Sequence, residues 1–331
     1  MKKLLALILS LISVFTFAFA VVGCTPATPS YDGAVKIYMP DGAPALAFAK
    51  LMHDENKLGK DDLTYTVVSA NNIGGVVANG TATAALMPIN AASKLCGTGD
   101  RYKILSVNTH GNLYVLSKQT PDGIDSLKGK KVGVINLANV PGLTFKAILK
   151  KNEITYTEDE SAHTSTSVFL KNIEAGQVAA LLNATDNAKL DYVVAPEPQV
   201  SKLTTAAPVI KNVLSLQTLW GEDSYPQAVL VVKNELAQDA QFCNALLSAL
   251  SESATWVKTH GEDAYNAIST HTAEGYATTL APTVLTESAI TGCNIKVVKA
   301  NEMKATINDY IQKIIEIEPT SASVVSDNFF I

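Results

Sequence analysis

The first residues of the globular region alternate between apolar and polar side chains. Residues 35–39 place Val, Ile and Met on one face and Lys and Tyr on the other, which is the two-residue period of a β-strand. Residues 40–42 read Pro-Asp-Gly, a turn sequence, and Pro44 stands where the first turn of a helix tolerates proline. Good helix formers follow from 45 to 52. These residues therefore predict a strand, a sharp turn and a helix.

Such a unit has the local geometry of a ligand-binding turn. The first N–H groups of a helix have no partner inside the helix, so a turn that leads into one points unpaired donors outward. In an open α/β sheet this turn lies at the carboxyl end of a strand, where ligands bind. For this stretch alone, an ordinary strand–helix connection is the alternative.

The next part of the chain extends the same alternation of elements. Further strands are predicted at 63–69, 82–87, 102–108 and 112–117, with turns at 71–75, 88–90 and 109–111 and short helices at 76–79 and 91–95.

The pattern restarts after residue 117. Residues 131–136 predict a strand, 137–142 a turn with Pro and Gly, and 143–152 a helix, which repeats the layout of the opening unit. The remaining sequence predicts a helix within 164–178, a strand at 190–195, a helix from 199, strands at 209–216 and 225–232, and mainly helix from 234, with helices at 240–260, 261–269, 282–286 and 301–315. This alternation predicts an α/β fold with largely parallel sheets, and the restart predicts two lobes.

The N-terminus carries the most specific signal of the sequence. A short basic flank, Lys2 and Lys3, precedes an uncharged apolar run at 4–22, as in a secretory signal. The run ends in Val-Val-Gly followed by Cys24, which resembles the lipobox of bacterial lipoproteins, although the Leu usual at the position of Val21 is missing. This resemblance implies a signal peptide at 1–23, lipidation of Cys24 and a tether at 24–33. An uncleaved membrane anchor is the alternative, and both interpretations place the globular part outside the cytoplasmic membrane.

Composition and charge exclude some classes of partner. The chain has 331 residues, of which 47% are hydrophobic and 17% charged, enough to bury a large core. Its 26 basic and 31 acidic side chains give a net charge of −5, and loss of Lys2 and Lys3 with the signal peptide leaves 24 basic residues and a charge of −7. This balance argues against a nucleic-acid partner. Arg101 is the only arginine, so at most one guanidinium can hold a ligand anion.

The three other cysteines give no metal or redox motif. Cys96, Cys243 and Cys293 form no closely spaced pair, so a zinc site is not predicted. They allow at most one disulfide and one free thiol, and three buried reduced thiols are the alternative.

Several segments, in this order, resemble a known protein family. They are 39–51, 85–95, 126–152 and 193–203, after the lipobox. Together they resemble the extracytoplasmic solute-binding proteins of ABC importers, in the nitrate/sulfonate/taurine and thiamine-pyrimidine (NMT1/THI5-like) branch. The segment 195–201 departs from the family pattern by an extra proline before its glutamate.

The resemblance implies a type II periplasmic-binding-protein fold, in which two α/β lobes are joined by two crossing strands. By analogy the crossings fall near Leu116–Ser117 and at 225–227, so that lobe one comprises 34–116 and 226–331 and lobe two comprises 117–225. It also implies a monomer without a cofactor that binds a small molecule, closes about a hinge, and delivers its ligand to a permease and ATPase.

Ligand contacts are expected from the loops at the carboxyl ends of the strands. The candidates from lobe one are Asp41, Gly42, Ala43, Pro44, Asn72, Gly74, Pro88, Ile89, Asn90, Asn108 and His110, and those from lobe two are Asn136, Asn139, Val140, Pro141, Glu197 and Gln199. Trp220 and Tyr225, near the return crossing, are candidates for stacking on a flat ligand.

Each candidate also has a structural interpretation. Asp41 is equally suited to capping the following helix, and Glu197, between two prolines, to an exposed bend. The asparagines Asn72, Asn90 and Asn136 suit turns, because they tolerate left-handed backbone. Trp220 is equally suited to packing, and His110 to a turn or the surface.

The ligand's charge is left open by the sequence. Helix N-termini near Pro44 and Pro141 favour an anion such as a sulfonate or nitrate. Asp41 and Glu197 instead favour positive charge or N–H donors, and amide and aromatic side chains suit a flat ring. We favour a neutral or amino-bearing heterocycle, such as a thiamine-pyrimidine precursor. An enzyme on the same fold and a lipid-anchored sensor are the competing functions.

Overall fold

The computed structural model describes residues 30–221 and 224–331. The predicted signal peptide, the lipidation site Cys24 and most of the tether therefore lie outside the described residues. Within the described part of the chain, no helix is both long and apolar enough to cross a membrane.

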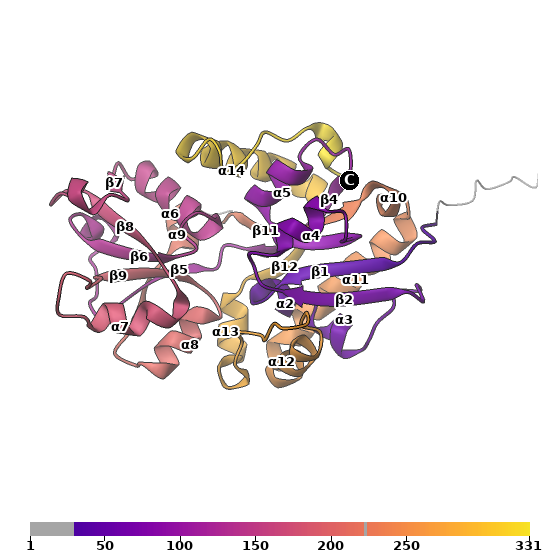
Figure 1. The fold of residues 1–331 in the computed structure, drawn as a ribbon, viewed down its shortest axis with the longest axis horizontal. Helices are drawn as coiled ribbons and strands as arrows, with labels where there is room; N and C mark the ends of the chain where they lie inside the picture. The colour runs from indigo at the N-terminus through magenta and orange to yellow at the C-terminus, as the bar shows by residue number, and fades with distance from the viewer. Residues whose placement is uncertain (1–29, 222–223) are drawn as a thin grey trace, which may run out of the picture.

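The strands form two six-stranded sheets, and each sheet with its helices makes one lobe (Figure 1). The first sheet has the order β12-β4-β11-β3-β1-β2 and contains β1 (Val35–Pro40), β2 (Leu63–Val68), β3 (Ala84–Pro88), β4 (Tyr102–His110), β11 (Pro226–Lys233) and β12 (Ile295–Lys299). The second has the order β10-β5-β9-β6-β8-β7 and contains β5 (Leu113–Ser117), β6 (Lys131–Ile135), β7 (Tyr156–Thr157), β8 (Val168–Ile173), β9 (Tyr192–Pro196) and β10 (Lys211–Ser215). The predicted α/β class with two lobes is confirmed.

The helices divide between the lobes as the strands do. The first lobe carries α2 (Ala43–Ala47), α3 (Ala49–His53), α4 (Ile73–Ala78), α5 (Ile89–Cys96), α10 (Asn234–Ala237), α11 (Ala240–Trp256), α12 (Gly261–Thr270), α13 (Glu287–Gly292) and α14 (Lys304–Ile317). The second carries α6 (Val140–Lys151), α7 (Val178–Asn183), α8 (Gln199–Ala206) and α9 (Leu216–Trp220). Figure 1 shows α14 extending toward the second lobe, where it packs on α6.

Apart from the edge strand β12, which is antiparallel to β4, each sheet has one strand that runs opposite to all the others. β1 pairs in parallel with β2 and β3, and β6 pairs in parallel with β8 and β9. β11 is antiparallel to β3 and β4, and β5 is antiparallel to β9 and β10. Each of these antiparallel strands enters its sheet directly after the chain arrives from the other lobe, so the polypeptide crosses between the lobes twice.

The first crossing lies earlier in the chain than the sequence predicts. β4 continues through Thr109 and His110, where a turn is predicted, and only Gly111 and Asn112 separate it from β5. Because β5 pairs with β9 of the second sheet, the chain crosses at Gly111 and Asn112 and not at Leu116–Ser117. The return crossing falls between α9 and β11, next to the predicted residues 225–227.

Two further predictions about elements are wrong, and one strand was missed in the region after 234, which is mainly helical as predicted. The segment 164–178, predicted to hold a helix, instead contains strand β8, because its apolar run Val168–Leu170 is buried in the sheet between β6 and β7. A short apolar run does not by itself separate a buried strand from a buried helix. The mainly helical region after 234 also contains the edge strand β12, which forms by pairing with β4. The helix predicted at 282–286 is a 3₁₀ turn (Pro282–Val284), and α13 begins only at Glu287.

The hydrophobic core joins the two lobes. One cluster of buried residues includes Met87 and Val107 of the first lobe and Val134 and Phe145 of the second, with Tyr225 of the return crossing in the same cluster. A second cluster covers the other face of the first sheet, under α2, α3, α11 and α12. The lobes are therefore packed on one another along the side where α14 meets α6.

Candidate functional site

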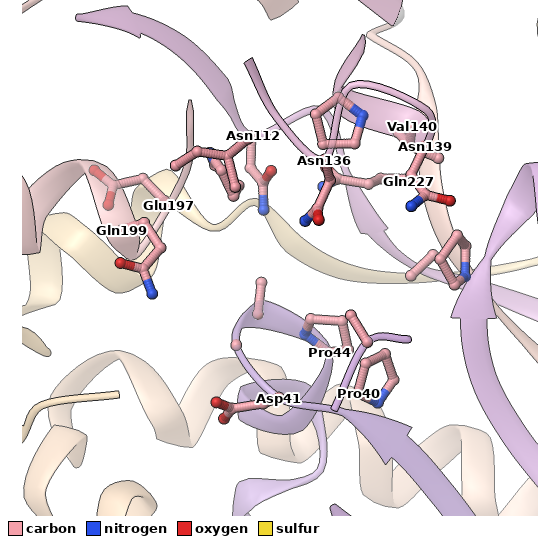
Figure 2. Close-up of a pocket in the computed structure, with 18 of the residues that line it drawn as sticks. Pro40, Asp41, Pro44, Asn112, Asn136, Asn139, Val140, Glu197, Gln199 and Gln227 are labelled. Atoms are coloured by element: carbon pink, nitrogen blue, oxygen red, sulfur yellow. The ribbon is translucent and has the colours of Figure 1, made fainter. Parts of the chain in front are cut away.

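A cavity of about 280 Å³ lies between the lobes, at the carboxyl ends of the parallel strands of both sheets. Figure 2 shows Pro40, Asp41 and Pro44 on one side of it and Asn112, Asn136 and Asn139 on the other. Eleven of the residues predicted as candidates from the sequence line it: Asp41, Gly42, Ala43, Pro44, Pro88, Asn136, Asn139, Val140, Pro141, Glu197 and Gln199.

The opening turn forms as the sequence predicts. β1 ends at Pro40, and Gly42 takes φ 95°, a left-handed conformation that glycine adopts without strain. Gly42 is also the N-cap of α2, with proline in the first helical turn. The backbone N–H of Asp41 donates to the Val68 carbonyl at 3.0 Å, which joins the turn to the end of β2.

Asp41 does not cap the helix that follows it. The N-cap is Gly42, and no side chain caps α2. The Asp41 carboxylate instead accepts hydrogen bonds from the Tyr276 hydroxyl at 3.1 Å, the Thr278 hydroxyl at 2.7 Å, and the Thr279 backbone N–H and hydroxyl at 2.6 and 2.7 Å. The interpretation of Asp41 as a helix cap is therefore wrong, and its charge is bound within the first lobe.

The second lobe supplies a matching turn after β6. Asn136 has φ 61°, so its predicted suitability for left-handed backbone is confirmed, and it lines the cavity as well. Asn139 is the N-cap of α6, which also has proline in its first turn. Gly142 lies so close to the Leu137 carbonyl that a Cβ there would be 1.8 Å from the oxygen, so the turn requires glycine.

Glu197 is buried, not an exposed bend. It is 8% exposed, and its carboxylate accepts from the backbone N–H and the hydroxyl of Ser201, both at 3.0 Å. Burial raises the pKa of this carboxyl above its ordinary value, and the two hydrogen bonds from Ser201 oppose that shift. No cation pairs with it among the described residues.

Replacement of Glu197 by glutamine will change the pH dependence of stability. Because folding raises the pKa of Glu197, ionisation of its carboxyl destabilises the folded state. The loss of stability is complete at pH values above the raised pKa of the folded state. It disappears at pH values below the ordinary pKa of the unfolded state. We expect wild type to lose stability relative to Glu197→Gln as the pH rises from 4 to 8, measured by urea unfolding. Glu174→Gln, at an exposed carboxyl on the same cavity wall, is the control. A difference independent of pH would contradict the expectation.

The chain crossings supply a polar floor to the cavity that the sequence analysis missed. Thr109 lies at the end of β4, just before the first crossing, Asn112 lies in that crossing, and Gln227 lies at the start of β11 after the second; all three line the cavity. Within the described residues, Thr109 Oγ1, Asn112 Oδ1 and Gln227 Oε1 are buried without a hydrogen-bond partner. The Asn112 Nδ2 donates to the Cys293 carbonyl at 3.4 Å, which leaves its Oδ1 for another donor. A buried polar atom without a partner costs about 1–3 kcal/mol, so a ligand that donates hydrogen bonds here is stabilised.

Other lining residues were also missed. They are Pro40, Ala70, Ile135, Glu174, Ala175, Pro196, Pro198, Ala228, Tyr276 and Thr279. Most stand at the last residue of a strand or within two residues after it, and could have been found once every strand end was placed. Glu174 and Ala175 follow β8, the strand predicted as a helix, and Tyr276 and Thr279 belong to a loop that no pattern connects with the cavity.

Several predicted contacts lie outside the cavity lining. Asn72 is an exposed N-cap of α4, and Gly74 is in its first turn. Ile89 is buried at the start of α5, and next to it Asn90 donates from Nδ2 to the Ser321 carbonyl at 3.2 Å. Asn108 is buried within β4 and accepts from the Ser106 hydroxyl at 2.8 Å.

His110 is buried at the end of β4 and not in a turn, so the surface interpretation is wrong. Its Nε2 donates to the Lys296 carbonyl at 3.0 Å, and burial lowers the pKa of the imidazole. The side chain therefore joins β4 to β12.

The two aromatic candidates pack against each other elsewhere. Trp220 and Tyr225 form a cluster with Tyr310 of α14, with ring centroids 5.3–5.9 Å apart. The Tyr225 hydroxyl donates to Gln217 at 3.1 Å, and the ring is fully buried. Both lie outside the cavity lining, because the return crossing turns them toward α14. For Trp220 the packing interpretation is the one that holds.

The cavity lining is acidic and rich in amides. Its titratable carboxylates are Asp41, Glu174 and Glu197, and no lysine or arginine is among the described residues that line it. Five amide side chains also line the cavity, Asn112, Asn136, Asn139, Gln199 and Gln227, together with the hydroxyl-bearing side chains of Thr109, Tyr276 and Thr279. Carboxylates without basic partners disfavour an anionic ligand.

The three cysteines that the structure describes provide no reactive group. Cys96, Cys243 and Cys293 are free and buried, as in the second of the two alternatives. Burial raises the pKa of Cys96 to about 12 and that of Cys243 to about 11, and raises that of Cys293 well above its ordinary value. These thiols therefore stay protonated near neutral pH and are poor nucleophiles.

Comparison with known proteins finds likeness in structure but not in sequence. No protein-family model matches the chain, and no curated protein matches it. An ABC transporter protein from Parabacteroides distasonis superposes with a TM-score of 0.69 and 19% identity, covering 91% of this chain and 99% of the other. The periplasmic aliphatic sulphonate-binding protein SsuA from Escherichia coli superposes with a TM-score of 0.66 and 12% identity over 89% and 91% of the two chains. A mutant of DSZB, in complex with biphenyl-2-sulfinic acid, superposes with a TM-score of 0.57 and 13% identity over 89% and 96% of the two chains.

These likenesses, together with the two sheets and the double crossing, establish the architecture. The chain has the two-lobed fold of periplasmic-binding-protein-like structures.

Proposed function

We propose that the chain is the extracytoplasmic solute-binding protein of an ABC importer, which binds a small molecule between its lobes and delivers it to a permease and its ATPase. One observation carries the proposal. Loops at the strand ends of both lobes close around one cavity, and its floor holds buried oxygen atoms that have no hydrogen-bond partner in the described part of the chain. Such concave sites with a few convergent polar groups are typical of small-molecule binding.

The lining supports a neutral or amino-bearing heterocycle as the ligand. Oδ1 of Asn112 and Oε1 of Gln227 are acceptors, so they require a ligand with N–H or O–H donors. The three carboxylates of the lining likewise favour a ligand with N–H donors or positive charge. Sulfonates and nitrate are the alternative, supported by the helix N-terminus at Pro141, but no basic side chain of the described lining would neutralise them.

A lipid anchor on Cys24 would hold the protein at the outer face of the cytoplasmic membrane. This part of the proposal depends on the sequence alone: the basic flank, the apolar run and the small residues before the cysteine. Labelling of the full chain with a radioactive fatty acid, which Cys24→Ser should abolish, tests it.

Calorimetric titration against a panel of ligands tests the binding role. The panel contains cytosine and adenine as amino-bearing rings, riboflavin, taurine and nitrate. Binding of an amino-bearing ring supports the proposed ligand class, whereas binding of taurine or nitrate alone overturns it. Turnover of any compound by the purified protein would favour the enzyme alternative.

Gln227→Met is expected to weaken binding of the ligand found in this way by about 10- to 100-fold, since a hydrogen-bond acceptor is lost from a desolvated site. Methionine retains the length of the side chain, so the fold should be unaffected. Gln238→Met, at an exposed glutamine outside the cavity lining, is the matched control. Equal affinities of the two variants would show that Gln227 does not contact the ligand.

A further inference from the structure

The loop at residues 276–279 lies across one edge of the cavity. It follows α12, and the chain just before it is held to β2, because Val67 donates to the His271 carbonyl and Ala273 donates to the Val67 carbonyl, both at 2.8 Å. Tyr276 and Thr279 of this loop line the cavity. We call residues 276–279 the clasp.

The clasp is bound to the first lobe through one side chain. All four hydrogen bonds that it makes to Asp41 converge on a single carboxylate, from three hydroxyls and one backbone N–H, at 2.6–3.1 Å. Hydrogen bonds to an ionised group are about twice as strong as neutral ones. Asp41 therefore fixes the clasp beside the opening turn.

The clasp is bound to the second lobe by a much weaker contact. Lys202 of α8 donates from Nζ to the carbonyl oxygen of Thr279 at 2.8 Å, and this contact is exposed to solvent. Thr279 therefore connects the two lobes: its N–H and hydroxyl reach Asp41 of the first, and its carbonyl reaches Lys202 of the second. Exposed contacts of a flexible lysine contribute little stability and exchange readily.

The contacts between lobes on the α14 side are of another kind. There Thr144 of α6 and Tyr310 of α14 share a buried hydrogen bond of 2.8 Å, inside the apolar cluster that joins the lobes. A hinge motion that preserves the buried contacts must open the exposed ones. The clasp therefore lies on the side of the cleft that such a motion opens.

We infer that Asp41 is a positioning residue, which holds the clasp and with it the Tyr276 wall of the cavity, and that Lys202 closes the cleft by binding the clasp. This inference rests on the proposed function, since it assigns the opening edge of that binding site. The four donors already on the Asp41 carboxylate leave it no direct role as a hydrogen-bond acceptor for the ligand, so that Asp41 acts on the ligand through its charge alone.

Hydrogen–deuterium exchange without ligand tests the anchor. Asp41→Asn should speed amide exchange in residues 274–281 by at least about tenfold, because the Thr279 N–H loses its charged acceptor. Thr279→Val, which removes only one hydroxyl donor, is a milder second variant and should give a smaller increase in the same residues. Unchanged exchange in both variants would overturn the anchoring role of Asp41.

Distance measurement between spin labels tests closure. Labels at Thr205 on α8 and Ala277 in the clasp, both exposed, report the width of the cleft in a Cys24→Ser background. Lys202→Met should add a longer distance population, while exchange in 274–281 stays close to wild type. Lys189→Met, at an exposed lysine of the same lobe, is the control. A distance distribution in Lys202→Met identical to that of the control would overturn the closing role of Lys202. Neither measurement uses a ligand, so failure here leaves the titration test of the binding function intact.

Discussion

Gly142→Ala will destabilise the protein by about 3 kcal/mol and remove ligand binding. This loss of stability is at the upper end of the range for overpacking a core. The new Cβ would lie 1.8 Å from the Leu137 oxygen and 2.5 Å from its carbonyl carbon, and these are backbone atoms that no side-chain rotation can move aside. The first turn of α6 must therefore shift away from β6. That turn carries Asn139, Val140 and Pro141, which form the wall of the cavity in the second lobe. Urea unfolding and ligand titration measure the two effects.

Gly176→Ala separates this steric effect from a general effect of losing glycine. Gly176 lies in the same lobe, and a Cβ there would meet nothing within 4 Å. Neither glycine has a left-handed backbone, so alanine is conformationally allowed at both. We expect Gly176→Ala to have stability within about 0.5 kcal/mol of wild type. If both variants behave alike, the close approach of α6 to β6 is not what determines the cavity wall.

Tyr225→Ala will destabilise the protein by about 3–5 kcal/mol, the usual cost of removing a large buried aromatic side chain. The ring is fully buried, stacks on Tyr310 with centroids 5.9 Å apart, and contacts Trp220 at 5.4 Å. It lies just before β11, at the end of the return crossing, so its removal leaves a cavity in the cluster that joins the lobes. Chemical denaturation monitored by tryptophan fluorescence measures the loss.

Tyr225→Phe is the control that distinguishes packing from ligand stacking. It keeps the ring and removes only the hydroxyl, and the Gln217 oxygen that accepts from it also accepts from the Leu113 N–H at 2.8 Å. The expected cost is about 1 kcal/mol, with unchanged ligand affinity because Tyr225 is not among the residues lining the cavity. A large loss of affinity in this variant would restore Tyr225 as a ligand contact.

The two turns were the part of the site most accessible from sequence. Asp41–Pro44 and Asn136–Pro141 both line the cavity, because Pro and Gly specify turns and proline specifies a first helical turn through local backbone sterics alone. The carboxyl end of a parallel strand then places each turn at the same edge of its sheet. The role of Asp41 was not accessible in this way, since its partners lie more than 230 positions away in sequence.

Strands whose pairing decides their structure were predicted less well. Residues 168–173 became β8 because the sheet has a place for them beside β6, and 295–299 became β12 because β4 has a free edge there. The same dependence displaced the first crossing. β4 and β5 are consecutive strands separated by two residues, and only their pairing within different sheets shows where one lobe ends. Because the crossing was misplaced, Thr109 and Asn112 were absent from the predicted site.

The sequence by itself determined the α/β class, the repeated strand–turn–helix units and the acidic, arginine-poor composition, since these depend on local propensity, hydrophobic period and counting. Only the tertiary structure decided that the two turns face one another across a single cavity, that the crossings form its floor, and that Asp41 binds the clasp. The physical reason is the range of the interactions involved. A turn is specified by neighbouring residues, whereas a carboxylate's partners and an unpaired amide oxygen depend on which distant segments the folded core brings within hydrogen-bond distance.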